Sequence, residues 1–168
     1  FSNVINAGLY ILEPEVMALV PEGEKYDFSK DLFPRLLEMG WPMFAQAIDG
    51  VWFDVGSPKE LIRAQNVLIE RKDELSFPIP EGARIENGSF IDPTAHVAEG
   101  ALIENSVVAQ HAVVGTNAVL KHCVLMKGSK VENGVHLEYG ILSPGAIVSS
   151  NVSTANVILG DHERLEND

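Results

Sequence analysis

Asp54 places a carboxylate inside an apolar run, Gly50–Pro58, which reads GVWFDVGSP. The valine, tryptophan and phenylalanine side chains around it favour burial, so a charged residue there needs a physical reason. An aspartate shortly before a glycine can end a strand and begin a turn. It can also hold a metal ion, because carboxylate oxygens are preferred ligands of hard divalent cations. The local sequence leaves both interpretations open.

The composition bounds the function classes. The chain has 168 residues, 46% of them hydrophobic, and a net charge of −12. It can bury a core, but its acidic charge argues against binding to nucleic acid or to an anionic membrane. The single cysteine, Cys123, excludes an internal disulfide and a cysteine-based zinc site. No apolar run is long enough to span a membrane and no signal-peptide pattern opens the chain, so we expect a cytoplasmic protein.

Residues 1–75 predict the mixed α/β structure that must position Asp54. The apolar stretch Asn3–Leu12 predicts a buried strand, and Pro42–Gly56 predicts two strands around a turn at Asp49-Gly50. Between them, Glu13–Pro21 predicts a short helix with Pro14 in its first turn. Asp27–Gly40 predicts two short helical pieces divided by Pro34 and ended by Gly40.

The residues after Asp54 predict a capped helix. Ser57 is the expected N-cap, with Pro58 at the first helical position and Glu60 completing a capping box. The helix is expected to run to about Leu75, with one stripe made of Leu61, Ala64, Gln65 and Leu68. Ser76–Gly82 is rich in proline and predicts an extended linker.

From 83 to 160 the sequence repeats. Large aliphatic residues recur at steps of six, and the shorter steps of five recur every 17 residues, after Ile103, Leu120 and Leu137. A small or β-branched residue stands two positions before each large one, so the two point to the same side of a short strand. This pattern predicts a triangular coil of three short strands, stacked in parallel, with Ile85 in its first turn. Residues 161–168 form an acidic tail that we expect to fray or partly to cover the end of the coil.

The repeat resembles the hexapeptide pattern of left-handed parallel β-helices. The first part resembles the second half of nucleotide-sugar pyrophosphorylases, the sugar-1-phosphate nucleotidyltransferases. Three stretches in the expected order carry this second resemblance: NAGLYIL (Asn6–Leu12), YDFSKDLFPRLL (Tyr26–Leu37) and VWFDVGSPKELIRA (Val51–Ala64). The middle stretch is most similar to mannose-1-phosphate guanylyltransferases with an attached β-helix. The fold class expected is therefore the C-terminal piece of an α/β nucleotidyltransferase domain, residues 1–75, followed by a left-handed parallel β-helix.

The resemblance implies a reaction and roles for particular residues. A nucleoside triphosphate and a sugar-1-phosphate, such as mannose-1-phosphate with GTP or glucose-1-phosphate, would give a nucleotide-diphospho-sugar and pyrophosphate. Asp54 would be one of two carboxylates that hold Mg²⁺, whose charge lets two polyanions meet. Asn6 would bind sugar hydroxyls, and Gly8 would let the backbone approach the sugar. Trp52 could line the sugar pocket, although core packing is the favoured interpretation.

The family's GGxGTRLxPLT loop, its mid-domain aspartate and its EKP stretch do not occur in this sequence. We therefore expect no catalytic residue in this chain, and we expect that it is inactive without the preceding half. The β-helix is expected to pair copies of the chain into a homo-oligomer.

Two other function classes stay open. Some β-helix proteins of this type are acyltransferases that use a histidine base and acetyl-CoA, which would place His111 or His122 at a site. His96 and His136 precede inward aliphatic residues and should point outward, and no histidine has a partner carboxylate recognisable by spacing. The third class is a non-catalytic assembly module.

Cys123 occupies a small inward position of the repeat, so we expect it to be a core residue. Three lysines are expected either to bind a phosphorylated effector or, more simply, to form a charged outer face: Lys121, Lys127 and Lys130.

Overall fold

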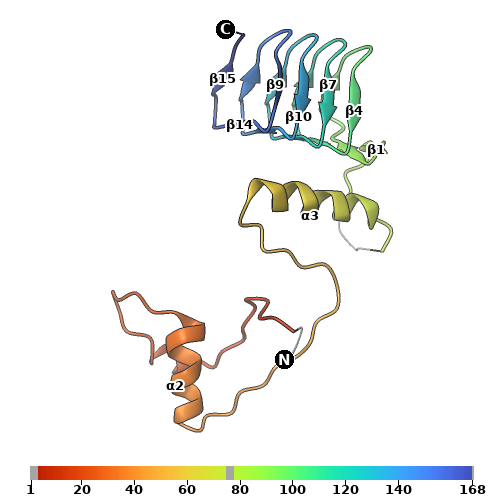
Figure 1. Ribbon diagram of the computed structural model, residues 1–168. Coiled ribbons are helices and arrows are strands. Elements are labelled where there is room, and N and C mark those ends of the chain that lie inside the picture. The colour runs from red at the N-terminus through yellow and green to blue at the C-terminus, as the bar shows by residue number, and fades with distance from the viewer. Residues whose placement is uncertain (1–3, 75–77, 168) are drawn as a thin grey trace. The chain divides into compact units, whose positions relative to one another are not determined.

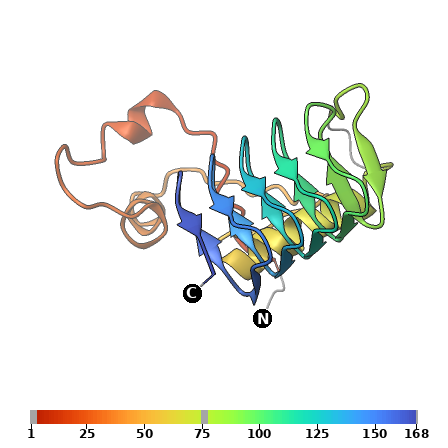
Figure 2. The same cartoon turned by 90° about the horizontal axis from the view of Figure 1, so that it is seen from above.

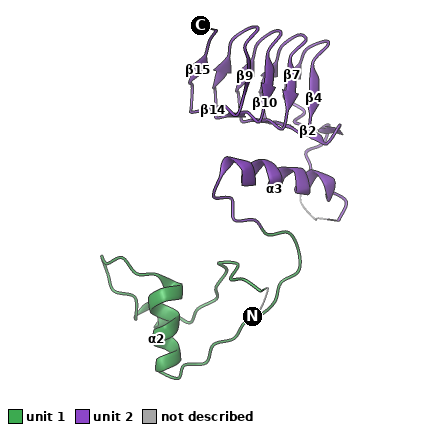
Figure 3. Ribbon diagram, in the orientation of Figure 1, with its two compact units in different colours: residues 1–52 green, residues 53–168 purple. Residues whose placement is uncertain are grey.

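The computed structural model describes residues 4–74 and 78–167. The chain divides into two compact units, Phe1–Trp52 and Phe53–Asp168 (Figure 3). The second unit includes the helix after Asp54 together with the repeat region.

The first unit is a small helical cluster. It contains α1 (Pro14–Met17), the π-helical turn η1 (Phe28–Leu32) and α2 (Phe33–Glu38). The buried centre of the cluster is Val16, Leu32 and Leu36. Pro14 begins α1 and Pro34 lies in the first turn of α2, where a missing N–H costs nothing. Gly40 follows the end of α2 with φ of +69°, so the predicted short helices and their glycine stop are confirmed.

The strands predicted in the first unit do not form. Residues 4–12 and 42–56 contain no strand, and Asn3 lies outside the described residues. Many of their apolar side chains are exposed instead, such as Leu9 at 77% and Phe44 at 95% of full exposure. An isolated extended segment leaves its backbone N–H and C=O groups without a ladder, so strands need neighbouring strands to persist. The first unit offers these segments no neighbouring strand within its described residues.

The second unit begins with α3 (Pro58–Glu70), whose predicted N-cap is confirmed. The Glu60 N–H donates to Ser57 Oγ at 3.3 Å. The reciprocal half of the predicted capping box is replaced, because the Glu60 carboxylate pairs with Arg63 at 3.4 Å. The helix ends at Glu70, earlier than predicted, and the predicted end Leu75 lies outside the described residues.

The repeat region is a parallel β-helix with three faces (Figure 1). One sheet has six strands in the order β1-β2-β5-β8-β11-β14, one has four in the order β13-β10-β7-β4, and one has five in the order β15-β12-β9-β6-β3. Each strand from β2 to β12 pairs in parallel with the strand three places later, and the paired residues lie 17 positions apart, as Val108 with Leu125 and Val97 with Val114. The parallel coil is therefore confirmed, and its left hand stays a prediction. The strands are β1 (Arg84–Glu86), β2 (Ser89–Ile91), β3 (His96–Val97), β4 (Leu102–Glu104), β5 (Val107–Val108), β6 (Val113–Val114), β7 (Val119–Lys121), β8 (Val124–Leu125), β9 (Lys130–Val131), β10 (His136–Glu138), β11 (Ile141–Leu142), β12 (Ile147–Val148), β13 (Ser153–Ala155), β14 (Ile158–Leu159) and β15 (Arg164–Leu165).

The core of the β-helix is the predicted register of large and small residues. Leu120, Leu125 and Leu142 are fully buried among the large positions. Ala118 and Cys123 are fully buried among the small ones, so Cys123 is a core residue as predicted. Each fully buried leucine contributes about 1.5–3 kcal/mol relative to an exposed one. The repeated core therefore stabilises the coil turn by turn.

The first predicted turn is a hairpin rather than a coil. Strand β1, which contains Ile85, pairs antiparallel with β2. Asn87 and Gly88 connect the two strands with φ of 49° and 66°. Positive φ at both central residues is the requirement of a type I′ turn, for which Asn-Gly is the preferred dipeptide. The local turn chemistry therefore overrides the repeat at this point, and β1 occupies the edge of the six-stranded sheet.

Helix α3 covers the outer face of the six-stranded sheet (Figure 2). Ile62 of α3 packs with Val124 and Ile141, which are outward residues of β8 and β11. Ile62 and Ala64 are buried, whereas Leu68 of the predicted stripe is 40% exposed. The outward positions of this sheet are apolar in every parallel strand, 17 residues apart: Phe90, Val107, Val124, Ile141 and Ile158.

Candidate functional site

Asn6 begins a tight turn in the first unit. Its Oδ1 accepts a hydrogen bond from the Gly8 N–H at 2.8 Å, and its Nδ2 donates to the Tyr10 hydroxyl at 2.7 Å. Gly8 has φ of +75° and no atom lies within 4 Å of the position a Cβ would take. Gly8 is therefore needed for its backbone conformation, and the space above it is open among the described residues.

The Asn6 amide keeps capacity for a ligand. A primary amide offers two N–H donors and two acceptor lone pairs. One donor and one lone pair are used by Tyr10 and Gly8, so one of each remains on an exposed side chain. A vicinal pair of sugar hydroxyls presents the complementary donor and acceptor. The geometry is compatible with the predicted role of Asn6 and adds Tyr10, which the sequence analysis did not identify.

A hydrogen bond of Trp52 joins the stretch Val51–Ala64 to the stretch Asn6–Leu12. Its Nε1–H donates to the Ala7 carbonyl oxygen at 3.1 Å, although the two residues are 45 positions apart. Trp52 is 44% exposed, so the favoured interpretation of it as a core residue is wrong. The hydrogen bond fixes the indole beside the Asn6–Gly8 turn, while part of the ring stays open to solvent.

Asp54 stands two residues after Trp52, at the start of the second unit, and its side chain is exposed. Its carbonyl oxygen accepts the Gly56 N–H at 2.9 Å in a turn that leads to the Ser57 cap. The described residues contain no group of three or more His, Cys, Asp or Glu that could hold a metal ion. Proteins hold Mg²⁺ with one or two carboxylates plus substrate phosphates, so Asp54 fits one such ligand but not a complete site.

The histidines lie on corners or on the outside of the coil. His96 and His136 are exposed, as predicted. His111 and His122 occupy left-handed corner positions with φ of 57° and 52°, and the His122 ring stacks on Tyr139 with centroids 4.8 Å apart. In the described part of the chain, no hydrogen bond or ion pair joins a histidine to a carboxylate. A general base oriented by a carboxylate is therefore absent from that part.

Cys123 is unsuited to nucleophilic chemistry. Burial raises the pKa of its thiol from 9.0 to about 11. The thiol donates to backbone carbonyl oxygens of Lys121 and Leu137, at 3.2 and 3.3 Å. The reactive thiolate is thus disfavoured at neutral pH, which agrees with a packing role.

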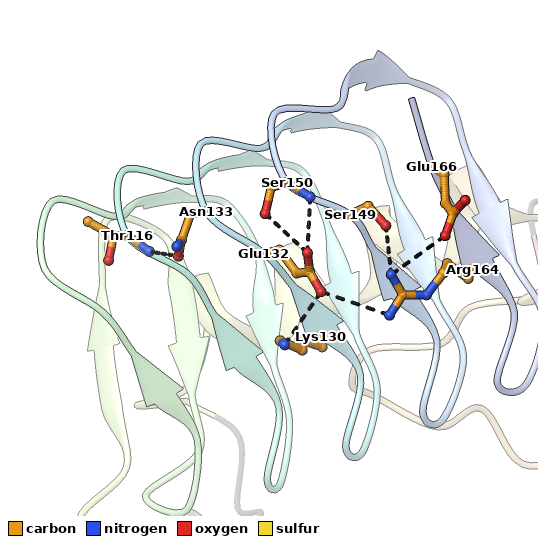
Figure 4. A network of polar contacts seen from close by, with 8 residues as sticks. All are labelled: Thr116, Lys130, Glu132, Asn133, Ser149, Ser150, Arg164 and Glu166. Carbon is orange, nitrogen blue, oxygen red and sulfur yellow. Dashed lines mark hydrogen bonds and ion pairs between the residues drawn. The ribbon is translucent and has the colours of Figure 1, made fainter. Parts of the chain in front are cut away.

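A polar network centred on Glu132 ties successive turns of the coil together (Figure 4). The Glu132 carboxylate accepts from the Ser150 N–H at 3.2 Å and from its hydroxyl at 3.1 Å, and it pairs with Lys130 at 3.5 Å. The Ser150 hydroxyl, followed by the Ser150 N–H and Lys130, holds the pKa of Glu132 below its ordinary value. Arg164 of the final strand lies 3.9 Å from the same carboxylate.

The ion pairs of two lysines help to decide whether the lysines bind a phosphorylated effector or form a charged outer face. Lys130 pairs with Glu132, and Lys121 pairs with Glu104 at 3.2 Å. Both ion pairs lie on the outside of the coil, where each glutamate offsets the positive charge of its lysine. Less positive charge is therefore available to attract an anionic effector. The simpler of the two expectations, a charged outer face, agrees with this arrangement.

Among the described residues, no helix is both long and apolar enough to cross a membrane.

Known proteins resemble both parts of the chain. Residues 1–71 match the family described as "Nucleotidyl transferase". A UTP–glucose-1-phosphate uridylyltransferase of Synechocystis sp. is 30% identical over 158 residues, which cover 86% of this chain and 39% of that protein. A glucose-1-phosphate adenylyltransferase of Bacillus cereus is 31% identical over 173 aligned positions, which cover 98% of this chain and 45% of that protein. The chain therefore spans less than half the length of these curated relatives.

Among solved structures, the acetyltransferase domain of PglB from Neisseria gonorrhoeae is 20% identical with a TM-score of 0.34, over 68% of this chain and 67% of that one. We infer no function from a likeness at this level. The repeat region, by contrast, is matched over residues 78–168, which is more than half of the chain. The chain belongs to the family described as "GMPPB C-terminal domain", and a nucleotidyl transferase segment precedes that domain in it.

Proposed function

We propose that this chain is the C-terminal part of an enzyme that joins a nucleoside triphosphate and a sugar-1-phosphate into a nucleotide-diphospho-sugar and pyrophosphate. The observation that carries the proposal is the ordered match of both parts, residues 1–71 and 78–168, to families of this kind. The relatives named above are a uridylyltransferase and an adenylyltransferase of glucose-1-phosphate, which supports the reaction class. The hydrogen bond from Trp52 to Ala7 supports it further, because it joins the stretches that carry Asn6 and Trp52.

In the proposed reaction, a phosphate oxygen of the sugar-1-phosphate attacks the α-phosphorus of the triphosphate, and pyrophosphate leaves. The residues of this chain position the sugar rather than exchange protons. Asn6 uses its remaining N–H and lone pair on two sugar hydroxyls, held in orientation by Tyr10 and the Gly8 N–H. Gly8 gives the sugar access to the backbone.

Asp54 would supply one carboxylate ligand to Mg²⁺, which offsets the charge on the two phosphate groups when it is bound. The second ligand and the nucleotide-binding loop would come from the preceding half of the longer protein, so this chain alone would be inactive. The identity of the base depends on that half. The relatives share glucose-1-phosphate and differ in the base, while mannose-1-phosphate with GTP is the alternative that the middle stretch favours.

Self-association through the β-helix is a further part of the proposal. The last strands β13, β14 and β15 each lie at the edge of a sheet, so they present unpaired backbone groups at one end of the coil. Such edges favour pairing with another chain unless they are covered. We expect a homo-oligomer in the cytoplasm, with no contact to nucleic acid or membrane.

The test measures pyrophosphate release by the full-length protein with different triphosphates and with glucose-1-phosphate or mannose-1-phosphate. Asp54→Asn should lower kcat/KM at least about a hundredfold at limiting Mg²⁺, because it removes a charged metal ligand. Asn6→Ala should raise KM for the sugar phosphate about tenfold, as expected for one lost pair of ligand hydrogen bonds. Asp49→Asn is the matched control, since Asp49 is an exposed aspartate of the same segment. Equal activity of Asp54→Asn and Asp49→Asn would contradict the role of Asp54.

The acyltransferase interpretation gains no specific observation, because His111 and His122 lie at corners without a partner carboxylate in the described residues. A non-catalytic assembly role describes this chain on its own, and it is compatible with activity of the longer protein.

A further inference from the structure

The chain contains the same tripeptide, Glu-Asn-Gly, at residues 86–88 and at 132–134. An asparagine followed by glycine can react with its own backbone, because glycine has no Cβ to hinder the approach of its nitrogen to the side-chain amide carbon. The local chemistry of the two sites is therefore matched. Any difference between them comes from the structure around each one.

The second tripeptide is held by the preceding turn of the coil. Asn133 Oδ1 accepts from the Thr116 N–H at 2.9 Å, a contact drawn in Figure 4. The Gly134 N–H donates to the Thr116 carbonyl oxygen, also at 2.9 Å. Both groups that would have to react are thus bound to the same backbone unit, and moving them together requires that two hydrogen bonds open.

Among the described residues, no earlier turn of the coil lies before the first tripeptide, because β1 is the edge strand of its sheet. Asn87 and Gly88 form the exposed two-residue turn between β1 and β2. Within the described residues, no hydrogen bond involves the Asn87 side chain or the Gly88 N–H. The Asn87 main-chain carbonyl oxygen, which takes no part in the reaction, accepts from the Asn105 N–H at 3.0 Å and from the Ser89 hydroxyl at 3.4 Å.

We propose that Asn87 is a site of spontaneous deamidation and isomerisation, and that Asn133 is protected. The Gly88 nitrogen attacks Asn87 Cγ, a C–N bond forms, and the side-chain amide leaves as ammonia, which carries away the Gly88 proton. Water then opens the resulting ring at either carbonyl and gives aspartate or isoaspartate. Isoaspartate adds a carbon atom to the main chain, so it lengthens the two-residue turn and disturbs the pairing of β1 with β2.

The test incubates the folded, full-length protein in mildly alkaline buffer and follows both peptides by mass spectrometry with fragmentation that distinguishes isoaspartate. Asn87 should be lost about tenfold faster than Asn133, given the two hydrogen bonds that restrain only the second site. In denaturant the two sites should react at similar rates, and Asn87→Gln should remove the product from the first peptide alone. Equal rates in the folded protein, or faster loss of Asn133, would overturn the proposal.

Discussion

The two units of this chain satisfy their apolar residues in opposite ways. In the β-helix, Leu120, Leu125 and Val131 have no exposed surface, because each turn of the coil covers the next. In the first unit, Ile11 and Phe44 are almost fully exposed although they occur in equally apolar stretches. The difference teaches that a repeat carries its own packing partners within a few tens of residues. A piece of an α/β sheet depends instead on strands that are distant in the sequence.

The largest expected effect is the difference in unfolding free energy between truncating a leucine in the β-helix and truncating one in the first unit. Leu120→Ala should lower the free energy of unfolding of the β-helix by about 2–5 kcal/mol, because a fully buried leucine leaves a cavity. Leu9→Ala, at a leucine that is 77% exposed, should change it by less than about 0.5 kcal/mol. Urea unfolding followed by circular dichroism measures both. A comparable loss for the two variants would show that the first unit is packed in solution.

A second prediction concerns the full-length protein. If the segments 4–12 and 42–56 become strands in the longer protein, their amides should exchange with deuterium at least about a hundredfold more slowly there than in this chain alone. The amides of the β-helix should exchange at similar rates in both. Fast exchange of the two segments in the full-length protein would contradict their assignment to a sheet.

A smaller effect should appear at the caps of the helices. Ser57→Ala should destabilise the second unit by about 1 kcal/mol, because the Glu60 N–H loses its acceptor and α3 covers the outer face of a sheet. Asp27→Ala removes a similar cap, which accepts from Ser29 and Lys30, but it lies in the first unit. Its effect should be absent from the unfolding transition of the β-helix. The comparison of the two midpoints is the measurement, and a shift of that transition by Asp27→Ala would show that the units unfold together.

The smallest effect should be the acid sensitivity of the Glu132 network. The pKa of Glu132 is lowered in the folded chain, so its stabilising contribution is present above its ordinary value of 4.5 and is lost as the pH falls through the folded-state pKa. Glu132→Gln should therefore flatten the loss of stability below that value, as seen in thermal midpoints measured against pH. Exposed Glu99 offers the control variant Glu99→Gln. The same acid dependence in Glu132→Gln as in the unchanged protein would show that the Glu132 network does not contribute to the acid sensitivity.

The core of the β-helix was predictable because each partner stands at a fixed interval. Apolar residues also recur at this interval on the outer face of one sheet, from Phe90 to Ile158. This pattern is present in the sequence and indicates that another element, here α3, covers that face. The Asn-Gly dipeptide indicates the hairpin that makes β1 antiparallel, but the sequence prediction counted this turn as part of the first coil. Local turn chemistry outweighs periodicity where the two conflict.

The candidate site was less predictable. The Trp52–Ala7 hydrogen bond joins residues 45 positions apart, which no local pattern indicates. The Asn6–Tyr10 pair is local, but the strand predicted over Asn3–Leu12 would have placed residues four positions apart about 13 Å from each other. The predicted strands around Asp54 failed because an apolar run specifies burial without specifying what buries it. Glu132 was missed for a similar reason, since its partner Ser150 stands in the next turn of the coil.

We propose above all that this chain is the C-terminal part of a sugar-1-phosphate nucleotidyltransferase. The most direct measurement compares pyrophosphate release, from triphosphate and sugar-1-phosphate, by the full-length protein and by the 168-residue chain. We expect Mg²⁺-dependent release by the full-length protein and none above background by the chain alone. Release by the chain alone at a comparable rate, or no release by the full-length protein with any triphosphate and sugar phosphate tried, would contradict it.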